Sequence, residues 1–364
     1  MRDGCRRARW SWRARLGCAA ATITLSRHGN DSTGLLEHVP LHFSPPIACE
    51  ALLARARTVF EDDQLTVLYD GDGRRARWCV GADEDPVGFP DRSIAYAAAE
   101  DETWMWPPVV SGHRREIRVR GKQLELETLE TNPRLFRVRS LLSSDECALV
   151  RSMAEGHYTE SASYDEDSGE QFDAARDGRR RSHNAFVGLL HNKRFSGFPT
   201  SERIERLQRR VASLMRMGMP NAEPWQVVRY APGGFYRLHQ DGVYFPEYNT
   251  TRVATVLVYL NSLHGDDGGA TNFPYSGGVP ATPRDAHSCS EGRTVVPHQG
   301  DALVFYNVLP RAPGRVWRPE ELVFDSTAKH AACPLVRSEK YIANIWLHSA
   351  DPTAGLRWGT ANSP

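Results

Sequence analysis

Residues 230–241, YAPGGFYRLHQD, contain the spacing Tyr-x-x-Gly-x-x-Tyr-x-x-His-x-Asp. Side chains alternate between the two faces of a β-strand, so His239 and Asp241 point to the same face, about 7 Å apart along the strand. At that spacing an imidazole and a carboxylate can bind one metal ion side by side. A second histidine from elsewhere would complete a two-histidine, one-carboxylate site, which holds Fe(II) and leaves coordination positions open. Most His-x-Asp tripeptides are surface residues, so the tripeptide alone indicates such a site only weakly.

Three later segments strengthen this interpretation: GGATNFP at 268–274, PHQGDALVFYN at 297–307 and DSTAKHAACPLVRSEKYIANIWL at 325–347. In the last of them, His330 precedes Lys340 by ten residues, and Lys340 begins a strand-like apolar run. Together with residues 230–241, these segments resemble, in the same order, four motifs of the prolyl 4-hydroxylase family of 2-oxoglutarate- and iron-dependent oxygenases. The resemblance covers the chain from about residue 133 to about residue 350.

The resemblance implies the ligands of a metal ion and of a cosubstrate. The Fe(II) ligands it implies are His239, Asp241 and His330. For 2-oxoglutarate it implies contacts with the ammonium group of Lys340 and with the hydroxyl groups of Tyr230 and Thr271. Ascorbate is a further expected cofactor. An aspartate at the second ligand position favours hydroxylation, because related halogenases have a small residue there.

The same resemblance implies that O2 and a proline-containing peptide are the remaining reactants, and that 4-hydroxyproline, succinate and CO2 are the products. The residues expected on the peptide side are Tyr236, Arg252, Trp346 and His348. A loop at 155–182, ending in the pair Arg181–Ser182, is expected to close over the peptide, unless it is only a solvated basic loop. Two alternatives stay open. One is an oxygenase acting on peptidyl lysine, a free amino acid or a nucleobase, and the other is a non-catalytic binding barrel.

Strand parity gives an independent expectation for residues 340–348. Lys340, Trp346 and His348 have the same parity, so they would point to the same side of a strand. Lysine is rarely buried without a partner, so an inward Lys340 requires an anion. The family's anion at this position is the distal carboxylate of 2-oxoglutarate.

Other residues that could bind metal lie outside the motif positions and are assigned no ligand role. These are His183, His191, His264, His287 and His298. Cys289 and Cys333 either pair across the mouth of the barrel or leave Cys333 as a free buried thiol. Neither alternative is favoured by the sequence.

The composition is that of an ordinary soluble protein, with 45 basic and 45 acidic residues in 364 and about 40% apolar residues. Balanced charge disfavours a nucleic-acid partner. The seven cysteines form no CxxC pair, so they neither indicate zinc nor decide the redox compartment.

The N-terminus is basic, with a short apolar run at 16–25 that is too short to cross a bilayer. It fits a secretory signal, an organellar transit peptide or a disordered tail, and membrane association is expected only through it. The expected location is therefore the endoplasmic reticulum or secretory pathway, with organellar or cytoplasmic locations as alternatives.

Four parts are expected along the chain: a targeting or disordered segment (1–29), a small strand-rich accessory region (30–132), the dioxygenase domain (133–350) and a tail (351–364). In the accessory region we expect hairpins at 63–81 and 115–129, a loop with a surface helix at 90–112, and packing tryptophans. In the dioxygenase domain, Ser143 and Glu146 predict a capping box, and Ser201 or Thr200 a second helix start.

Many short strands, few helices and one metal triad predict the fold class. It is mostly β with supporting helices: a double-stranded β-helix (jelly-roll, cupin-like) catalytic barrel with a small N-terminal extension.

Overall fold

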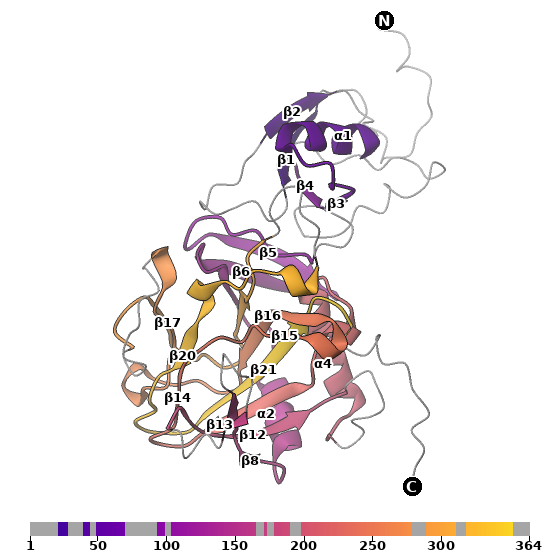
Figure 1. The fold of residues 1–364 in the computed structure, drawn as a ribbon. Coiled ribbons are helices and arrows are strands. Elements are labelled where there is room, and N and C mark those ends of the chain that lie inside the picture. The colour runs from indigo at the N-terminus through magenta and orange to yellow at the C-terminus, as the bar shows by residue number, and fades with distance from the viewer. Residues whose placement is uncertain are drawn as a thin grey trace, which may run out of the picture. The chain divides into compact units, whose positions relative to one another are not determined.

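A computed structural model describes residues 21–27, 39–43, 49–69, 93–98, 103–164, 171–172, 178–189, 198–278, 289–310 and 318–351 (Figure 1). The chain divides into two compact units. One comprises Met1–Pro107 with Pro310–Trp317, and the other Pro108–Leu309 with Arg318–Pro364. Within the described residues, every helix is too short or too polar to cross a bilayer.

The N-terminal unit contains a four-stranded sheet and one helix. In chain order its elements are β1 (Ala21–Arg27), β2 (Val39–Phe43), α1 (Cys49–Phe60), β3 (Val67–Tyr69) and β4 (Ser93–Ala98). The strand order is β2-β1-β4-β3, and only the central pair, β1 with β4, is parallel. This ββαββ arrangement is the topology of a β-grasp unit. Its core includes Trp104 and Trp106, both buried, whose rings meet edge to face at 5.8 Å. The prediction that these tryptophans pack is therefore confirmed.

Three predictions for this unit differ from the structure. Residues 21–27, expected in a targeting or disordered segment, form β1 in the interior of the sheet. Residues 93–98, expected as loop or surface helix, form β4. The expected hairpin at 63–81 contributes only β3, which pairs with β4, and residues 70–92 lie outside the described part. Residues 1–20 also lie outside it.

The boundary expected at residue 133 is wrong, because the larger unit begins near residue 108. The predicted hairpin is present as β5 (Arg114–Val119) and β6 (Lys122–Glu130), but β6 pairs with β7 (Leu135–Val138) of the larger unit. Leu124 and Leu126 of β6 are buried, so the hairpin is part of the core and does not belong to an accessory region.

The larger unit is built on two antiparallel sheets. Its remaining strands are β8 (Thr159–Glu160), β9 (Ser163–Tyr164), β10 (Gln171–Phe172), β11 (Arg180–Arg181), β12 (His183–Val187), β13 (Trp225–Tyr230), β14 (Phe235–His239), β15 (Tyr244–Phe245), β16 (Thr250–Tyr259), β17 (Thr271–Phe273), β18 (Arg293–Val295), β19 (Ala302–Tyr306), β20 (His330–Ala332) and β21 (Lys340–His348). One sheet runs β5-β6-β7-β19-β16-β21-β13-β12-β8, with β15 on β16, and the other runs β11-β14-β20-β17-β18.

From β13 to β21 the chain passes repeatedly between these sheets. Strands β13, β16, β19 and β21 lie side by side in the large sheet, and β14, β17, β18 and β20 in the small one (Figure 1). This alternation is the double-stranded β-helix, so the predicted fold class is confirmed. As predicted, β16 is a central strand, and nine of its ten residues are buried because both of its faces are covered.

Helices support the large sheet. Helix α2 (Ser144–Ala154) begins with the predicted capping box of Ser143 and Glu146, and it contacts β12 and β13. Helix α4 (Glu202–Leu214) is capped by Ser201. The 3₁₀ turns are η5 (Met219–Asn221), η6 (Pro246–Tyr248), η7 (Gly265–Asp267), η8 (Ser276–Gly278), η9 (Pro319–Glu321) and η10 (Ser326–Ala328).

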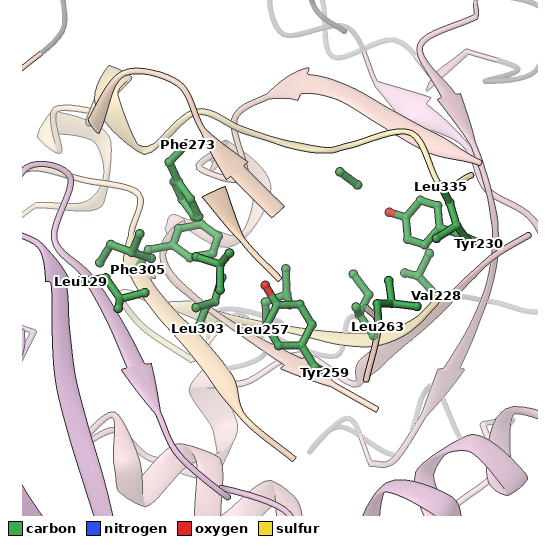
Figure 2. Close-up of a cluster of buried hydrophobic side chains, with 14 residues drawn as sticks. Leu129, Val228, Tyr230, Leu257, Tyr259, Leu263, Phe273, Leu303, Phe305 and Leu335 are labelled. Carbon is green, nitrogen blue, oxygen red and sulfur yellow. The ribbon is translucent and has the colours of Figure 1, made fainter. Parts of the chain in front are cut away.

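The barrel core joins both sheets. Figure 2 shows Phe273 of the small sheet against Phe305 of the large one, with Tyr259 and Tyr230 also facing inward. The Phe273 and Phe305 rings meet at 5.2 Å. This apolar interior provides the dry surroundings in which the polar side chains described next are held.

Candidate active site

Three side chains that can bind metal meet inside the barrel. His239 ends β14, Asp241 follows two residues later, and His330 begins the neighbouring strand β20, directly opposite His239 in the ladder. One ligand atom from each lies within 4.8 Å of the others. His239 Nε2 is 3.6 Å from Asp241 Oδ1, and His330 Nε2 is 3.8 Å from Asp241 Oδ2. The structure thus brings together the three residues that the motifs predicted as metal ligands.

Backbone contacts prepare both imidazoles to bind a cation. His239 Nδ1 lies 2.8 Å from the Arg237 carbonyl oxygen, and His330 Nδ1 lies 3.1 Å from that of Ala328. A carbonyl only accepts, so each Nδ1 carries the proton and each Nε2 presents its lone pair to the centre. Burial, followed by the nearby His330, lowers the pKa of His239 to about 3, which keeps its ring neutral.

Asp241 is buried and ionised. Burial alone would raise its pKa, but His330, His239 and a hydrogen bond from Thr255 outweigh this effect, and the net result is a lowered pKa. Thr255 Oγ1 donates to Asp241 Oδ2 at 2.8 Å. Two imidazoles and one carboxylate that converge inside the barrel are a suitable donor set for Fe(II).

Lys340 points into the same barrel, as strand parity predicted. It is 1% exposed, and its Nζ lies 5.3 Å from the centre of the Tyr230 ring without any hydrogen-bond partner. Burial lowers its pKa to about 7. Trp346, six residues further along β21, faces inward on the same side and pairs across the ladder with Thr255.

The two predicted hydroxyl groups are also in the barrel. Tyr230 is paired with Lys340 in the ladder of β13 and β21, and burial raises the pKa of its hydroxyl to about 12, so it remains a donor. Thr271 Oγ1 lies 2.9 Å from the hydroxyl of Tyr259. Tyr259 was not identified from the sequence. It lies on β16 at the same parity as Thr255, so strand alternation could have placed both side chains on the same face.

Arg180, not Arg181, enters the site. Its guanidinium lies 4.5 Å from the centre of the Tyr236 ring, its Nε donates to Ser182 Oγ at 2.7 Å, and its Nη2 is buried without a partner. Arg181 is exposed. Strand β11 pairs with β14, and its alternation turns Arg180 inward and Arg181 outward, which corrects the predicted pair.

Tyr236 connects this arginine to the metal-binding group. Its ring stacks on the imidazole of His239, with centres 3.6 Å apart and planes inclined by 18°. The Tyr236 ring is therefore in contact with both the guanidinium of Arg180 and the imidazole of the predicted metal ligand His239.

Arg252 and His348, expected on the peptide side, share a carboxylate that sequence reasoning missed. Glu223 accepts from Arg252 Nε at 2.5 Å and from Arg252 Nη2 at 2.9 Å, and it lies 2.7 Å from His348 Nε2. Arg252 and His348 outweigh the effect of burial and lower the pKa of Glu223 to about 2. The Arg252 guanidinium also lies 4.0 Å above the Trp346 ring. Both predicted residues are therefore fixed around Glu223.

The remaining predictions concern histidines and cysteines. In the described ranges, the triad above is the one cluster that could hold a metal, and His183, His264 and His298 are exposed. His191 and His287 lie outside the described residues. Cys289 and Cys333 form a disulfide with a Cα–Cα distance of 6.1 Å, which resolves the open alternative in favour of pairing.

Comparisons with known proteins agree with this geometry. Residues 225–348 match the model of the 2OG-Fe(II) oxygenase superfamily. The chain is 30% identical over 232 residues to prolyl 4-hydroxylase 5 of Arabidopsis thaliana, covering 61% of this chain and 71% of that protein. It is 29% identical over 231 residues to probable prolyl 4-hydroxylase 8 of the same plant, with the same coverage of both chains.

A solved structure is also similar. The viral collagen prolyl hydroxylase of Paramecium Bursaria Chlorella virus-1, in its 2-oxoglutarate complex, is 21% identical and has a TM-score of 0.36. The match covers 59% of this chain and 96% of the viral chain.

Proposed function

The chain belongs to the prolyl 4-hydroxylase family of 2-oxoglutarate- and Fe(II)-dependent oxygenases, and on this premise we propose that it hydroxylates proline within a peptide. It is a 2-oxoglutarate-dependent dioxygenase, with O2 as its other cosubstrate and succinate and CO2 as its co-products. The proposed organic product is 4-hydroxyproline. The relatives named above support this target.

The observation that carries the proposal is the unpaired ammonium group of Lys340 in the barrel that also holds the triad. An unpaired buried charge is costly, so its presence indicates an anionic ligand. A dicarboxylate can meet Lys340 with one end while its other end reaches a metal. The Lys340 ammonium lies beside Tyr230, in the same barrel as Asp241.

We propose that His239, Asp241 and His330 hold the iron. Iron held there would supply, with 2-oxoglutarate and O2, the oxidising power that converts a C–H bond to C–OH. The protein residues keep both Nε2 atoms and the carboxylate directed to one point, and the apolar barrel excludes water. Lys340 would bind the distal carboxylate of 2-oxoglutarate, with the hydroxyl groups of Tyr230 and Thr271 as further donors.

The peptide is proposed to lie beside Tyr236, Arg180 and Trp346. The unpartnered Nη2 of Arg180 is a buried donor suited to a peptide carbonyl, and the Tyr236 ring places that donor next to His239. Arg252 and His348 contribute through Glu223, which keeps the Arg252 guanidinium flat against Trp346. These contacts orient a prolyl ring without supplying any proton to the reaction.

The test is hydroxylation of defined peptides by the full-length chain with Fe(II), 2-oxoglutarate, O2 and ascorbate, which we expect as the reductant. A proline-rich peptide should gain one oxygen atom on proline by mass spectrometry, with an equivalent amount of succinate. His330→Ala should remove both products, whereas His264→Ala, at an exposed histidine outside the site, should retain them. Modification of a matched lysine peptide instead of the proline peptide would overturn the proposed target.

We also propose that the chain works in an oxidising compartment of the secretory pathway. The disulfide between Cys289 and Cys333 supports this, because such bonds are rare in reducing compartments. Labelling of free thiols in protein isolated under non-reducing conditions tests the pairing. Labelling of both Cys289 and Cys333 would contradict it.

A further inference from the structure

The orientation of the Asp241 carboxylate must be fixed by contacts from outside its own strand. Strand β14 ends at His239, so no ladder hydrogen bond fixes the residue two positions later. A carboxylate that can rotate would offer either oxygen, or both, to a metal ion. Contacts made by its side chain must therefore fix the orientation of the carboxylate.

Two fully buried polar side chains form that contact. Thr255 Oγ1 donates to Asp241 Oδ2 at 2.8 Å, and Asn307 Nδ2 donates to Thr255 Oγ1 at 3.2 Å. Both Thr255 and Asn307 are 0% exposed, so water does not compete for these bonds. An ionised carboxylate only accepts, which directs the threonine proton to Asp241 and requires its next partner to donate.

Asn307 is itself held by hydrogen bonds at its own backbone N–H and carbonyl groups. It follows β19, and its backbone N–H donates to the Val253 carbonyl of β16 at 2.8 Å. Gln240 Nε2 donates to the Asn307 carbonyl at 3.3 Å. A side chain at Gly242 would come within 3.0 Å of the Asn307 Cβ, so this glycine allows the close approach.

We propose that Thr255 and Asn307 are positioning residues that fix the orientation of the Asp241 carboxylate toward the two histidines and so prepare it to bind a metal ion. The two act through the aspartate, and neither is a ligand. A carboxylate held in place before the metal arrives binds it more tightly than one that must first be ordered. This inference rests on the proposed iron site.

The test is binding of Co(II) to the full chain without O2, followed by absorption spectroscopy, which requires no turnover. Thr255→Val keeps the shape of the side chain but removes its hydroxyl group. Loss of such an outer contact typically weakens metal affinity about 10–100-fold, and we expect that range together with an altered Co(II) spectrum. Thr255→Ser, which retains the hydroxyl, should remain within about threefold of the unmodified chain.

Thr251 provides the matched control. It lies on the same strand and is 0% exposed, but its Oγ1 donates to the Pro319 carbonyl at 2.7 Å, away from the triad. Thr251→Val should lower the melting temperature without changing the Co(II) affinity or spectrum. Asn307→Asp, which replaces the donor by an acceptor, should weaken Co(II) binding even if Thr255→Val does not fold.

The outcomes separate this inference from the function on which it rests. If Thr255→Val and Asn307→Asp bind Co(II) within about twofold of the unmodified chain, the positioning role is wrong and the iron site stands. Equal weakening by Thr251→Val would also overturn it, because loss of any buried hydroxyl would then suffice. Failure of the unmodified chain to bind Co(II) would overturn both the inference and the proposed iron site.

Discussion

Lys340 is 1% exposed and has no hydrogen-bond partner, so the ligand-free protein tolerates a costly group in its core. Burial favours the neutral amine and lowers the pKa to about 7. A bound carboxylate has the opposite effect, because it favours the ammonium form and raises the pKa. The protonation of Lys340 and the binding of 2-oxoglutarate are therefore linked.

The first prediction is that affinity for 2-oxoglutarate falls as the pH rises above 7. Below pH 7 the free protein already carries the ammonium form, so affinity should be flat. Above pH 7 a proton must be taken up on binding, and the dissociation constant should rise up to about tenfold per pH unit. Titration with 2-oxoglutarate at saturating Mn(II) from pH 6.5 to about pH 9 measures this slope.

Lys340→Arg is the control for this prediction. A guanidinium remains charged throughout this pH range, so the variant should bind more weakly but show no such slope. The same slope in both proteins would assign the titration to another group.

At the scale of an element, the turn between η7 and β17 makes room for the side chains of Leu335 and Leu263. Gly269, at φ +68°, lies where a Cβ would come within 2.7 Å of Leu335 Cδ1 and 2.9 Å of Leu263 Cδ1. Only glycine combines this left-handed backbone with the absence of a side chain. The turn thus gives the GGATNFP motif a steric function in addition to supplying Thr271.

The second prediction uses Gly269→Ala. Both backbone strain and crowding of Leu335 and Leu263 should lower the free energy of unfolding, by about 2–4 kcal/mol in total. Urea denaturation measures this loss.

Gly277 separates these causes. It has a similar φ of +73°, but no atom lies within 4 Å of the position of its Cβ. Gly277→Ala should therefore show only the strain, about 1–2 kcal/mol. If the two variants lose the same stability, the proposed crowding of the two leucines is absent.

At the scale of the whole molecule, the third prediction concerns the boundary between the units. A shortened chain of residues 108–364 should fold and bind Co(II) and 2-oxoglutarate, because it keeps the complete larger sheet from β5 onward. A chain of residues 133–364 should not fold. It loses the buried Leu124, Leu126 and Leu129, at about 1.5–3 kcal/mol each, which approaches the total stability of a domain.

Circular dichroism and thermal melting of the two shortened chains show which of them folds. A cooperative transition for residues 133–364 at the temperature found for 108–364 would show that β5 and β6 are dispensable. It would then favour the boundary near residue 133 that the motif resemblance suggested.

Predictions based on local chemistry agree with the structure. Capping by Ser143 depends on a contact three residues away, and the inward direction of Lys340 and Trp346 depends on the period of two along a strand. The ordered motifs also identified the three members of the metal cluster. In each case the controlling interaction lies within one element or one motif, so the sequence contains it.

What only the tertiary structure decided depends on contacts between distant segments. Pairing of β11 with β14 turns Arg180 inward and Arg181 outward. Glu223, just before β13, meets Arg252 of β16 and His348 of β21 only when the barrel assembles. The hydrogen bonds from Asn307 through Thr255 to Asp241 likewise join three separate segments. The sequence by itself determined the barrel, its candidate ligands and the direction of Lys340, because strand alternation and motif spacing are local. Sheet register, which places partners from far along the chain beside one another, determined what surrounds them.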